Sequence, residues 1–338
     1  MVPALAVADA LQASGASVFF IGGERAEVEL VPAAGYELHC LAVAGLDRRN
    51  PLRAARAIAL SLRATLAARM LLRAKGATAV MGGGGYVAAP VVLAARTLRL
   101  PIVLTEADSH LGLTNRALAR FARRVCLAFP ITGLNGPRYL VTGRPVAPLA
   151  NDRAAARAAL GIAPQQLCVL VFGGSLGARS INEAALEAFA QSSFHVLQIA
   201  GKRDFATLSE RPRGPNHDLR EYLELERFAE ALLASDLVVS RAGGSVFEIA
   251  AYGKPAILIP YPHAAADHQS SNAAWMERAG AAVVMADSEL NGVRLADEVG
   301  RLIDDPSRLE AMAHSSAALA RLDAAEAIAH ELLACSRP

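Results

Sequence analysis

Residues 169–190 read VLVFGGSLGARSINEAALEAFA, and this stretch decides the fold class. An apolar, β-branched run leads through a glycine-rich turn into an alanine- and leucine-rich segment that is typical of a helix. Strand, glycine turn and helix form the repeating unit of open parallel sheets. Backbone amides at the start of such a helix attract anions, so the turn around Ser175 is a candidate phosphate site. The alternative is a turn that only tightens strand–helix packing.

The same alternation of strands and helices runs through the whole chain. Short, continuous apolar runs between helices indicate parallel strands that are covered on both faces. The other predicted strands are VFFIG (18–22), ATAVMGGGG (77–85), PIVLT (101–105), FHVLQIAG (194–201), DLVVSRAGG (236–244) and PAILIPYP (255–262). The sequence therefore predicts an α/β protein built on parallel sheets.

A chain of 338 residues is long for one core and suits two domains. The proline-containing stretch from Gly143 to Gln166 is typical of a linker. We predict a first domain of residues 1–146 and a second of residues 147–338, whose last helix is a candidate to pack back on the first domain.

Charge is distributed unevenly along the chain. Residues 1–150 carry 17 Lys and Arg against 8 Asp and Glu, whereas the remainder carries 17 against 24. Ten basic residues and no acidic one lie from Arg48 to Thr105. Such a block indicates a surface that meets anionic lipid, phosphate or nucleic acid; the alternative is a compositional bias toward arginine. We find no leader peptide and no apolar stretch of the roughly 18 residues that span a bilayer, which predicts a cytoplasmic protein.

A second glycine turn lies in SRAGGSVFEIAAYGKPAILIPYP, residues 240–262. Glu248 falls in the first turns of the following helix, where a carboxylate is placed to bind the two hydroxyls of a ribose; the alternative is a helix-dipole contact. Beyond the next strand, Gln269 and Asn272 are neighbours on one helix face. His263 and His268 lack a third ligand, so we predict no metal site. With no D-x-D pair in the sequence, a diphosphate would depend on helix N-termini and side-chain donors.

The first half of the chain holds a turn of the same kind, MGGGGYVAAP at residues 81–90. The next strand ends in LTEADSH, with Glu106, Asp108 and His110. A tight turn and a solvated acidic loop are the alternatives to a binding site here.

Together these segments resemble the MurG family in order and spacing, from residue 2 to about residue 325. The segments are GGERAEVELVPAAGY (22–36), GGGGYVAAP (82–90), TEADSHLGLTNRALAR (105–120), VTGRPV (141–146), GGSLGAR (173–179), SRAGGSVFE (240–248) and GKPAILIPYPHAAADHQSSNA (253–273). Family members transfer N-acetylglucosamine from UDP-N-acetylglucosamine to the undecaprenyl-diphosphate-linked muramoyl-pentapeptide, a step of peptidoglycan synthesis. The resemblance implies the GT-B fold, two Rossmann-like domains with an interdomain cleft, and an inverting transfer without an enzyme-bound metal or a tightly bound cofactor.

The resemblance also implies roles for individual positions. On the donor side Ser175 would meet the diphosphate, Glu248 the ribose and Gln269 the sugar. The residues implied for uridine and phosphate are Gly243, Gly244, Ser245, Val246 and Phe247. On the acceptor side the turn of Gly83, Gly84, Gly85 and Tyr86 would face the lipid diphosphate.

Two segments depart from the family pattern. Where members have HEQN, this chain has TEAD, so Asp108 replaces an asparagine near the donor sugar. Where members often have GNPVR, this chain reads GRPVA, which leaves Arg144 as the arginine of that segment.

The family also has a strand and a G-x-G-G-H loop ahead of the helix with which this chain begins. The histidine of that loop is placed to accept the proton of the acceptor hydroxyl, a general base that the transfer requires. We expect that segment to lie upstream of Met1 and leave the catalytic residue unassigned; Asp108 and His110 are the candidates that this sequence offers.

For the basic block, the resemblance implies peripheral docking at the cytoplasmic face of the membrane, on an anionic lipid surface and not on nucleic acid. Arg53, Arg56 and Arg63 fall within a quarter-turn of one another on the predicted helix. Two alternatives remain: another GT-B enzyme of UDP-sugars, such as a glycolipid glycosyltransferase or a UDP-N-acetylglucosamine 2-epimerase, and a form that binds the donor with impaired catalysis.

Overall fold

The computed structural model describes residues 1–43, 51–174, 176–264 and 267–336, and for residues 51–55 and 86 it describes the backbone alone. The chain divides into two compact units, Met1–Val146 with Arg321–Pro338 (unit 1) and Ala147–Ala320 (unit 2). The first boundary falls where the sequence places it. The predicted second domain ran to residue 338, but the chain returns to unit 1 at Arg321.

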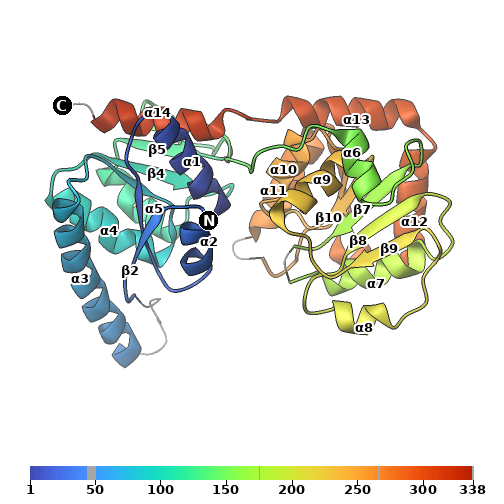
Figure 1. The fold of residues 1–338 in the computed structure, drawn as a ribbon, viewed down its shortest axis with the longest axis horizontal. Helices are drawn as coiled ribbons and strands as arrows, with labels where there is room; N and C mark the ends of the chain where they lie inside the picture. Colours follow the sequence, from blue (N-terminus) through green and yellow to red (C-terminus); the bar gives the residue numbers. More distant parts are fainter. Residues whose placement is uncertain (44–50, 175, 265–266, 337–338) are drawn as a thin grey trace. The chain divides into compact units, whose positions relative to one another are not determined.

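Unit 1 contains two parallel sheets, with strand orders β1-β2 and β3-β4-β5-β6 (Figure 1). Its strands are β1 (Phe19–Gly22), β2 (Glu37–Cys40), β3 (Val80–Gly82), β4 (Ile102–Glu106), β5 (Arg124–Leu127) and β6 (Tyr139–Val141). Its helices are α1 (Val2–Ala13), α2 (Glu27–Ala33), α3 (Pro51–Ala74), α4 (Gly85–Thr97), α5 (Leu113–Leu118), the 3-10 turn η1 (Ala119–Phe121) and α14 (Ala324–Ser336).

Each face of the four-stranded sheet has its own apolar core. Leu104 of β4 packs with Val92 of α4 and with α3 on one face. On the other face Val103 packs with α1 and with Ile328 of α14. Because α14 buries its apolar side chains here, the last helix packs on the first domain, as the sequence analysis expects, and the second unit ends at Ala320.

Unit 2 contains one six-stranded parallel sheet of order β12-β11-β10-β7-β8-β9. Its strands are β7 (Cys168–Phe172), β8 (His195–Ile199), β9 (His217–Arg220), β10 (Leu237–Ser240), β11 (Ala256–Leu258) and β12 (Ala282–Val284). Its helices are α6 (Arg153–Ala159), α7 (Arg179–Ala188), α8 (Phe205–Ser209), α9 (Leu225–Ala234), α10 (Val246–Ala251), α11 (His268–Arg278), η3 (Asp287–Glu289), α12 (Gly292–Ile303) and α13 (Pro306–Ala318).

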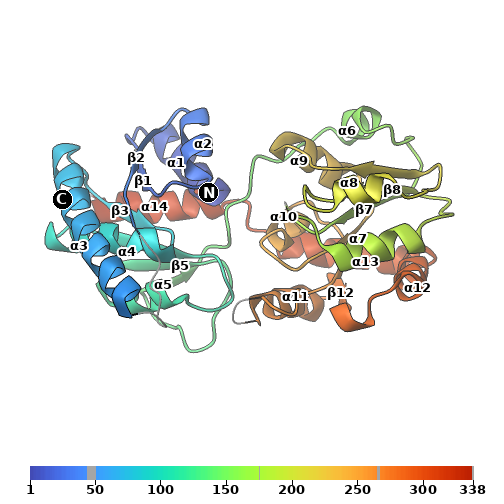
Figure 2. The ribbon, with the colours of Figure 1, turned by 90° about the horizontal axis from the view of Figure 1, so that it is seen from below.

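Helices cover both faces of this sheet, with α7 and α12 on one side and α6 and α9 on the other (Figure 2). Val169 and Val171 of β7 face the α7–α12 core. Phe172, which alternates with them, meets Phe228 of α9 at 5.0 Å between ring centroids. The α/β class and the parallel sheets predicted from the sequence are confirmed.

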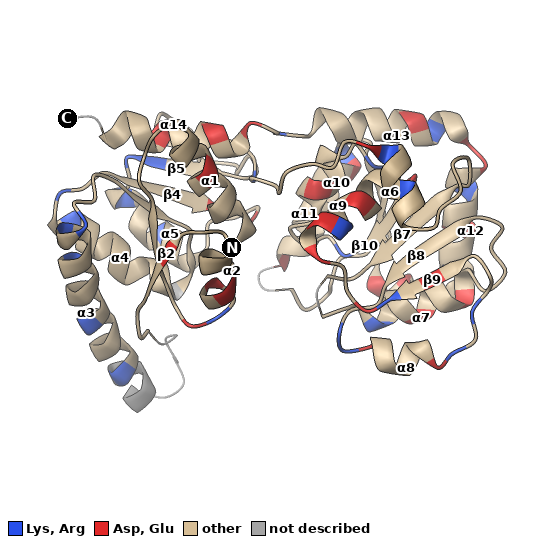
Figure 3. Cartoon of the chain, in the orientation of Figure 1, with Lys and Arg blue, Asp and Glu red and all other residues tan. Residues whose placement is uncertain are grey.

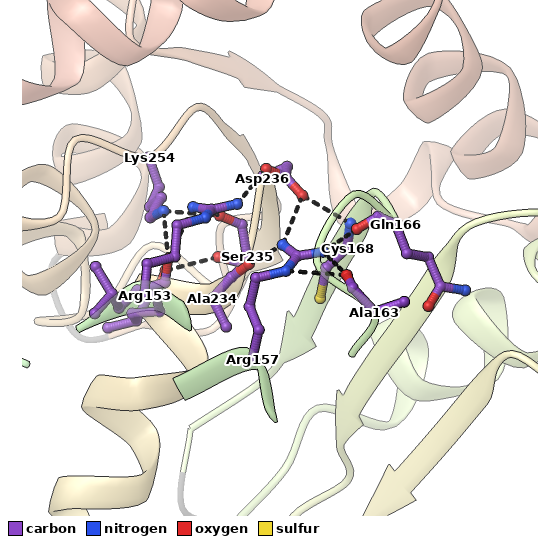
Figure 4. A network of polar contacts seen from close by, with 11 residues as sticks. Arg153, Arg157, Ala163, Gln166, Cys168, Ala234, Ser235, Asp236 and Lys254 are labelled. Carbon is purple, nitrogen blue, oxygen red and sulfur yellow. Dashed lines mark hydrogen bonds and ion pairs between the residues drawn. The ribbon is translucent and has the colours of Figure 1, made fainter. Parts of the chain in front are cut away.

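Helix α6 lies inside the stretch that the sequence assigns to a linker, and a partly buried polar network holds it to the sheet (Figure 4). Arg157 is 4% exposed and donates to three backbone carbonyl oxygens, including that of Ala234 at 2.8 Å. Asp236 pairs with Arg153 at 2.5 Å and with Arg157 at 3.5 Å. Lys254 donates to two carbonyl oxygens at the end of α9, and burial lowers its pKa to about 8. Cationic side chains thus meet the helix end that attracts them.

Candidate active site

The turn that follows β7 lies at the carboxyl edge of the sheet in unit 2. Gly174 and Gly177 have φ angles of 91° and 81°, a region that favours glycine. A Cβ atom on Gly177 would collide with the carbonyl oxygen of Ala200, which follows β8. The turn opens onto the start of α7, where free backbone amides can bind an anion. Ser175, the predicted diphosphate contact, lies outside the described residues.

The turn that follows β10 lies at the same edge and gathers polar side chains from α11. Asn272 donates through Nδ2 to the carbonyl oxygen of Ala242 at 3.0 Å. Gln269 accepts from the amide of Tyr261 at 2.9 Å, and its Nε2 lies 4.0 Å from where a Cβ atom of Gly243 would be. The structure therefore brings the predicted Gly243 and Gln269 together, with Gly244 and with Ser245 as the residue that precedes α10.

Helix α10 presents two kinds of group at its start. The side chains of Val246 and Phe247 are 0% and 6% exposed, and the Phe247 ring lies 5.4 Å from that of Trp275. The backbone amides of these two predicted donor contacts donate to the carbonyl oxygens of Gly243 and Gly244 at 3.3 and 3.2 Å, so the two residues shape the turn. Glu248, in the first turn and half-buried, offers a carboxylate.

Arg241 fixes the edge on which both turns lie. Its guanidinium pairs with Asp287 at 2.6 Å and donates to Ser180 Oγ at 2.9 Å. Ser180 in turn donates to Asp287 at 2.7 Å. Since these residues come from the end of β10, the start of α7 and η3, this triad joins three segments around the candidate site. Asp287 compensates the charge of Arg241.

In unit 1 the glycine turn follows β3. Gly84 and Gly85 have φ angles of 80° and 72°. A Cβ atom on Gly84 would lie 3.4 Å from Nδ2 of Asn115, a side chain that is 2% exposed. Gly83 has no neighbour closer than Thr105 Oγ1 at 3.9 Å from its Cβ position, and for Tyr86 the backbone alone is described.

A buried carboxylate supports this turn from the next strand. Glu106 is 7% exposed and accepts three hydrogen bonds, from the amides of Asp108 (3.2 Å) and Gly112 (2.9 Å) and from Asn115 Nδ2 (2.9 Å). Asn115 also donates to the carbonyl oxygen of Thr105 at 2.9 Å. The loop that carries Asp108 is thus held against the glycine turn by Glu106.

The remaining predicted residues of unit 1 lie in two loops. Asp108 and His110 are both half-buried, in the loop after β4. Arg144 follows β6 and is half-buried, and its Nε is buried with no hydrogen-bond partner in the described part of the chain. The structure thus divides the predicted residues, with Asp108 and Arg144 in unit 1 and the Gly243–Gln269 group in unit 2.

Known proteins were compared with the chain. The glycosyltransferase family 28 N-terminal domain matches residues 1–127, and the corresponding C-terminal domain matches residues 168–328. A UDP-N-acetylglucosamine–N-acetylmuramyl-(pentapeptide) pyrophosphoryl-undecaprenol N-acetylglucosamine transferase from Moorella thermoacetica is 40% identical and covers 98% of this chain and 94% of its own. The crystal structure of Acinetobacter baumannii MurG has a TM-score of 0.78 at 28% identity, covering 98% of this chain and 95% of that one. This chain belongs to the MurG family.

Membership is supported by a second relative with the same name, from Rubrobacter xylanophilus, which is 41% identical over 98% of this chain and 99% of its own. The fold is GT-B, as the sequence predicts. The calicheamicin glycosyltransferase CalG4 and the Neisseria meningitidis UDP-GlcNAc 2-epimerase share this fold, with TM-scores of 0.69 and 0.67 at 18% and 14% identity. The fold alone does not separate transfer from epimerisation; the 40% and 41% identical relatives are both named as N-acetylglucosamine transferases, and the activity of the family is this transfer.

Five of the ten basic residues of the block, all arginines, lie in α3, which carries no acidic residue (Figure 3). Its exposed large or charged side chains are Ile58, Leu62, Leu66 and Met70, and Arg56, Arg63 and Arg73. The four apolar residues recur every four positions, so they form a stripe along the helix. Met70 is 69% exposed, which is unusual for a large apolar side chain. The predicted Arg53 is described by its backbone alone.

Within the described residues, no helix is both long and apolar enough to cross a membrane, and His, Cys, Asp and Glu form no group of three that could hold a metal ion. His263 packs on Tyr261 at 5.5 Å between ring centroids.

Sequence reasoning missed three polar residues of these sites, the half-buried Arg241 and the buried Asn115 and Asn182, of which the last donates to the Ala200 carbonyl oxygen at 2.9 Å. Each lies in a quoted motif, two to five positions from a glycine. A polar residue of this kind beside a glycine turn was the available signal.

Proposed function

We propose that this chain transfers N-acetylglucosamine from UDP-N-acetylglucosamine to an undecaprenyl-diphosphate-linked muramoyl-pentapeptide, the step that completes the lipid-linked precursor of peptidoglycan. One observation carries the proposal: relatives named for this transfer are 40% and 41% identical over 98% of the chain. The two glycine turns at one edge of unit 2 support it, because they combine anion-binding amides with a carboxylate and an amide side chain.

Each donor group has a chemical counterpart in this edge. The amides that follow β7, with Ser175, would hold the diphosphate, and those of Gly243–Ser245, ahead of α10, would hold uridine and phosphate. Glu248 would accept hydrogen bonds from the ribose hydroxyls, and Gln269 would bind the sugar. Amide donors stabilise the charge of a diphosphate by hydrogen bonds without a cation, so transfer would proceed with no enzyme-bound metal and no tightly bound cofactor.

The acceptor would bind to unit 1. The Gly83–Tyr86 turn would receive the lipid diphosphate on amides at the start of α4. The arginines and the apolar stripe of α3 would dock peripherally on the cytoplasmic face of the membrane, with basic residues contributing about 1 kcal/mol each on anionic lipid. Cell wall synthesis, and with it cell shape and division, would be the biological setting.

An assay with and without acceptor tests the proposal. The purified chain is incubated with UDP-N-acetylglucosamine and anionic vesicles, with or without the lipid-linked muramoyl-pentapeptide, and with EDTA in a parallel sample. We expect UDP release that requires the acceptor and persists in EDTA. Acceptor-independent isomerisation of the sugar would identify an epimerase. UDP binding without any transfer would identify a donor-binding form.

A further inference from the structure

A series of buried polar side chains, linked by hydrogen bonds, lies next to the glycine turn that follows β7. Asn182 of α7, Gln198 of β8 and His217 of β9 are 0%, 0% and 7% exposed. Gln198 Nε2 donates to Asn182 Oδ1 at 3.1 Å, and Gln198 Oε1 lies 2.8 Å from His217 Nε2. Asn182 Nδ2 donates to the carbonyl oxygen of Ala200 at 2.9 Å and to Asp204 Oδ2 at 3.1 Å. Three strand and helix elements are thus connected by side chains inside the unit.

The direction of these hydrogen bonds is fixed by backbone carbonyl groups. The carbonyl oxygen of Ala200 accepts from Asn182, and the backbone carbonyl oxygen of Asn182 accepts from Gln198 Nε2 at 3.3 Å. A carbonyl oxygen only accepts, so both amide nitrogens must point toward these atoms. Gln198 Oε1 then faces His217, which must donate from a protonated Nε2. Burial lowers the pKa of His217 to about 4, which keeps the ring neutral at pH 7.

This series of hydrogen bonds ends at the backbone segment that contacts the turn. The carbonyl oxygen of Ala200 lies so close to Gly177 that a Cβ atom at Gly177 would collide with it. A Cβ atom on Gly201 would in turn collide with the backbone nitrogen of Gly177. The two segments are therefore in backbone contact, and the position of residues 200–201 determines that of Gly177.

We propose that Gln198 and His217 are positioning residues for the donor-diphosphate turn. They hold the Asn182 amide in the orientation that fixes Ala200 against Gly177, and they do so from the interior, without contact with the donor. This inference rests on the proposed function, since it takes the turn after β7 as the diphosphate site.

The chain offers a matched control in His195. This histidine is 9% exposed, and burial lowers its pKa as well. Side chains alternate along a strand, so His195 and Gln198 lie on opposite faces of β8. A change at His195 removes a similarly buried histidine from the same sheet and leaves the hydrogen bonds among Asn182, Gln198 and His217 in place.

The experiment compares His217→Phe, His217→Gln and His195→Phe in the full chain. UDP binding is measured by calorimetry, and the kcat and KM for UDP-N-acetylglucosamine are measured with acceptor. We expect His217→Phe to weaken UDP binding by about five- to tenfold, the value of one net hydrogen bond, and to raise KM more than it lowers kcat. His217→Gln should restore binding, because its side-chain amide can donate to Gln198. His195→Phe should leave UDP affinity unchanged, whatever it does to the melting temperature.

Gln198→Glu is the second variant, in case His217→Phe does not fold. It keeps the shape and the acceptor for His217 but removes the donor to Asn182, and we expect it to weaken UDP binding by at least as much. Equal UDP affinity in the unaltered chain, His217→Phe and Gln198→Glu would overturn this inference alone. Absence of UDP binding in the unaltered chain would overturn the proposed function and the inference with it.

Discussion

The glycine turns of the two units are built alike and supported differently. In each, a buried asparagine donates to a carbonyl oxygen at the carboxyl end of the neighbouring strand, Asn182 to Ala200 in unit 2 and Asn115 to Thr105 in unit 1. Gln198 satisfies the Asn182 side-chain oxygen, whereas Asn115 Oδ1 is buried without a hydrogen-bond partner in the part of the chain that is described. An unpaired buried acceptor costs about 1–3 kcal/mol. The asparagine behind the turn of unit 2 is therefore fully paired at its side-chain oxygen, and the asparagine behind the turn of unit 1 is not.

The sheets differ in the same sense. Unit 2 has six strands in one continuous ladder, whereas the described strands of unit 1 form ladders of two and four. The candidate donor site thus lies on the more extensively hydrogen-bonded unit. Rigid support suits a site that must bind the same nucleotide in every cycle, because a preformed site loses less free energy to ordering on binding.

The largest expected loss of stability distinguishes alanine substitutions at two glycines, one from each turn. Gly177→Ala places a methyl group against the Ala200 carbonyl oxygen at a φ of 81° and should lower the free energy of unfolding by more than about 3 kcal/mol. Gly85→Ala has a φ of 72° but no atom within 4 Å of its Cβ position, and it should cost only about 1–2 kcal/mol. Denaturant unfolding of both variants checks the difference. Equal losses would contradict the close backbone contact of Gly177.

The ion pairs that anchor peripheral helices should differ too. Asp236→Asn removes the charged partner of Arg153 and of Arg157, whose side chain is 5% exposed, and should cost about 1.5–3 kcal/mol because charge-assisted hydrogen bonds are lost. In unit 1, Glu331 of α14 pairs with Arg124 of β5 at 2.8 Å, and the arginine side chain is 34% exposed. Glu331→Gln should therefore cost about 1 kcal/mol or less. Melting temperatures rank the two variants, and a larger loss for Glu331→Gln would contradict the ranking.

Acid should destabilise unit 2 through His217. Its pKa is lowered from 6.5 to about 4 in the folded state, so the unfolded chain binds more protons between these values. Stability should fall as the pH drops from 6.5 to 4, by about 3 kcal/mol from this residue. His217→Gln should flatten that part of the pH profile measured by urea unfolding. An unchanged profile in the variant would show that His217 does not titrate as the buried ring requires.

A change at Glu106 should act on unit 1 alone. Glu106→Gln replaces an acceptor of three hydrogen bonds by a group that must turn its NH₂ toward a donor, and it should cost about 1–3 kcal/mol. UDP affinity should stay as in the unaltered chain, while KM for the lipid-linked acceptor rises. A loss of UDP affinity as large as that of a unit 2 variant would contradict the assignment of the donor site to unit 2.

The smallest effects concern single arginines. Arg63→Ala and Arg73→Ala remove exposed charges from α3 and should each weaken binding to anionic liposomes about fivefold, as about 1 kcal/mol implies. Arg294→Ala and Arg301→Ala are the controls, because in α12 of unit 2 both arginines pair with Glu298. Liposome flotation at several salt concentrations compares the four variants. Equal losses in both helices would argue against docking through α3.

Strands that are apolar throughout were predictable, and others were not. All seven predicted strands are present, as β1, β3, β4, β7, β8, β10 and β11. Four of the missed strands lie at sheet edges, namely β2, β6, β9 and β12. Polar residues interrupt their sequences, as in HDLR of β9 and ELHC of β2. An edge strand has one neighbour and less apolar burial, so its sequence carries a weaker signal. The fifth missed strand, β5, is a four-residue RVCL.

The sites divide in the same way. Glycine turns follow from local sequence, because the strand–turn–helix order places them at the carboxyl edge of a sheet. The residues that support them do not: Gln198 and His217 are separated by 19 positions and meet only because β8 and β9 pair in parallel. In the sequence, Gln198 is one polar residue within an apolar run, and His217 belongs to a short edge strand; neither has a local feature that marks its role.

Hydrogen exchange of the full chain with and without UDP-N-acetylglucosamine tests the central claim most directly, that this protein binds the donor at the carboxyl edge of the sheet in unit 2. We predict that the nucleotide slows exchange of the amides in residues 173–179 and 242–248, and that the amides of Gly83–Gly85 exchange at the same rate in both samples. Protection of the unit 1 turn without protection of residues 173–179 would contradict the account.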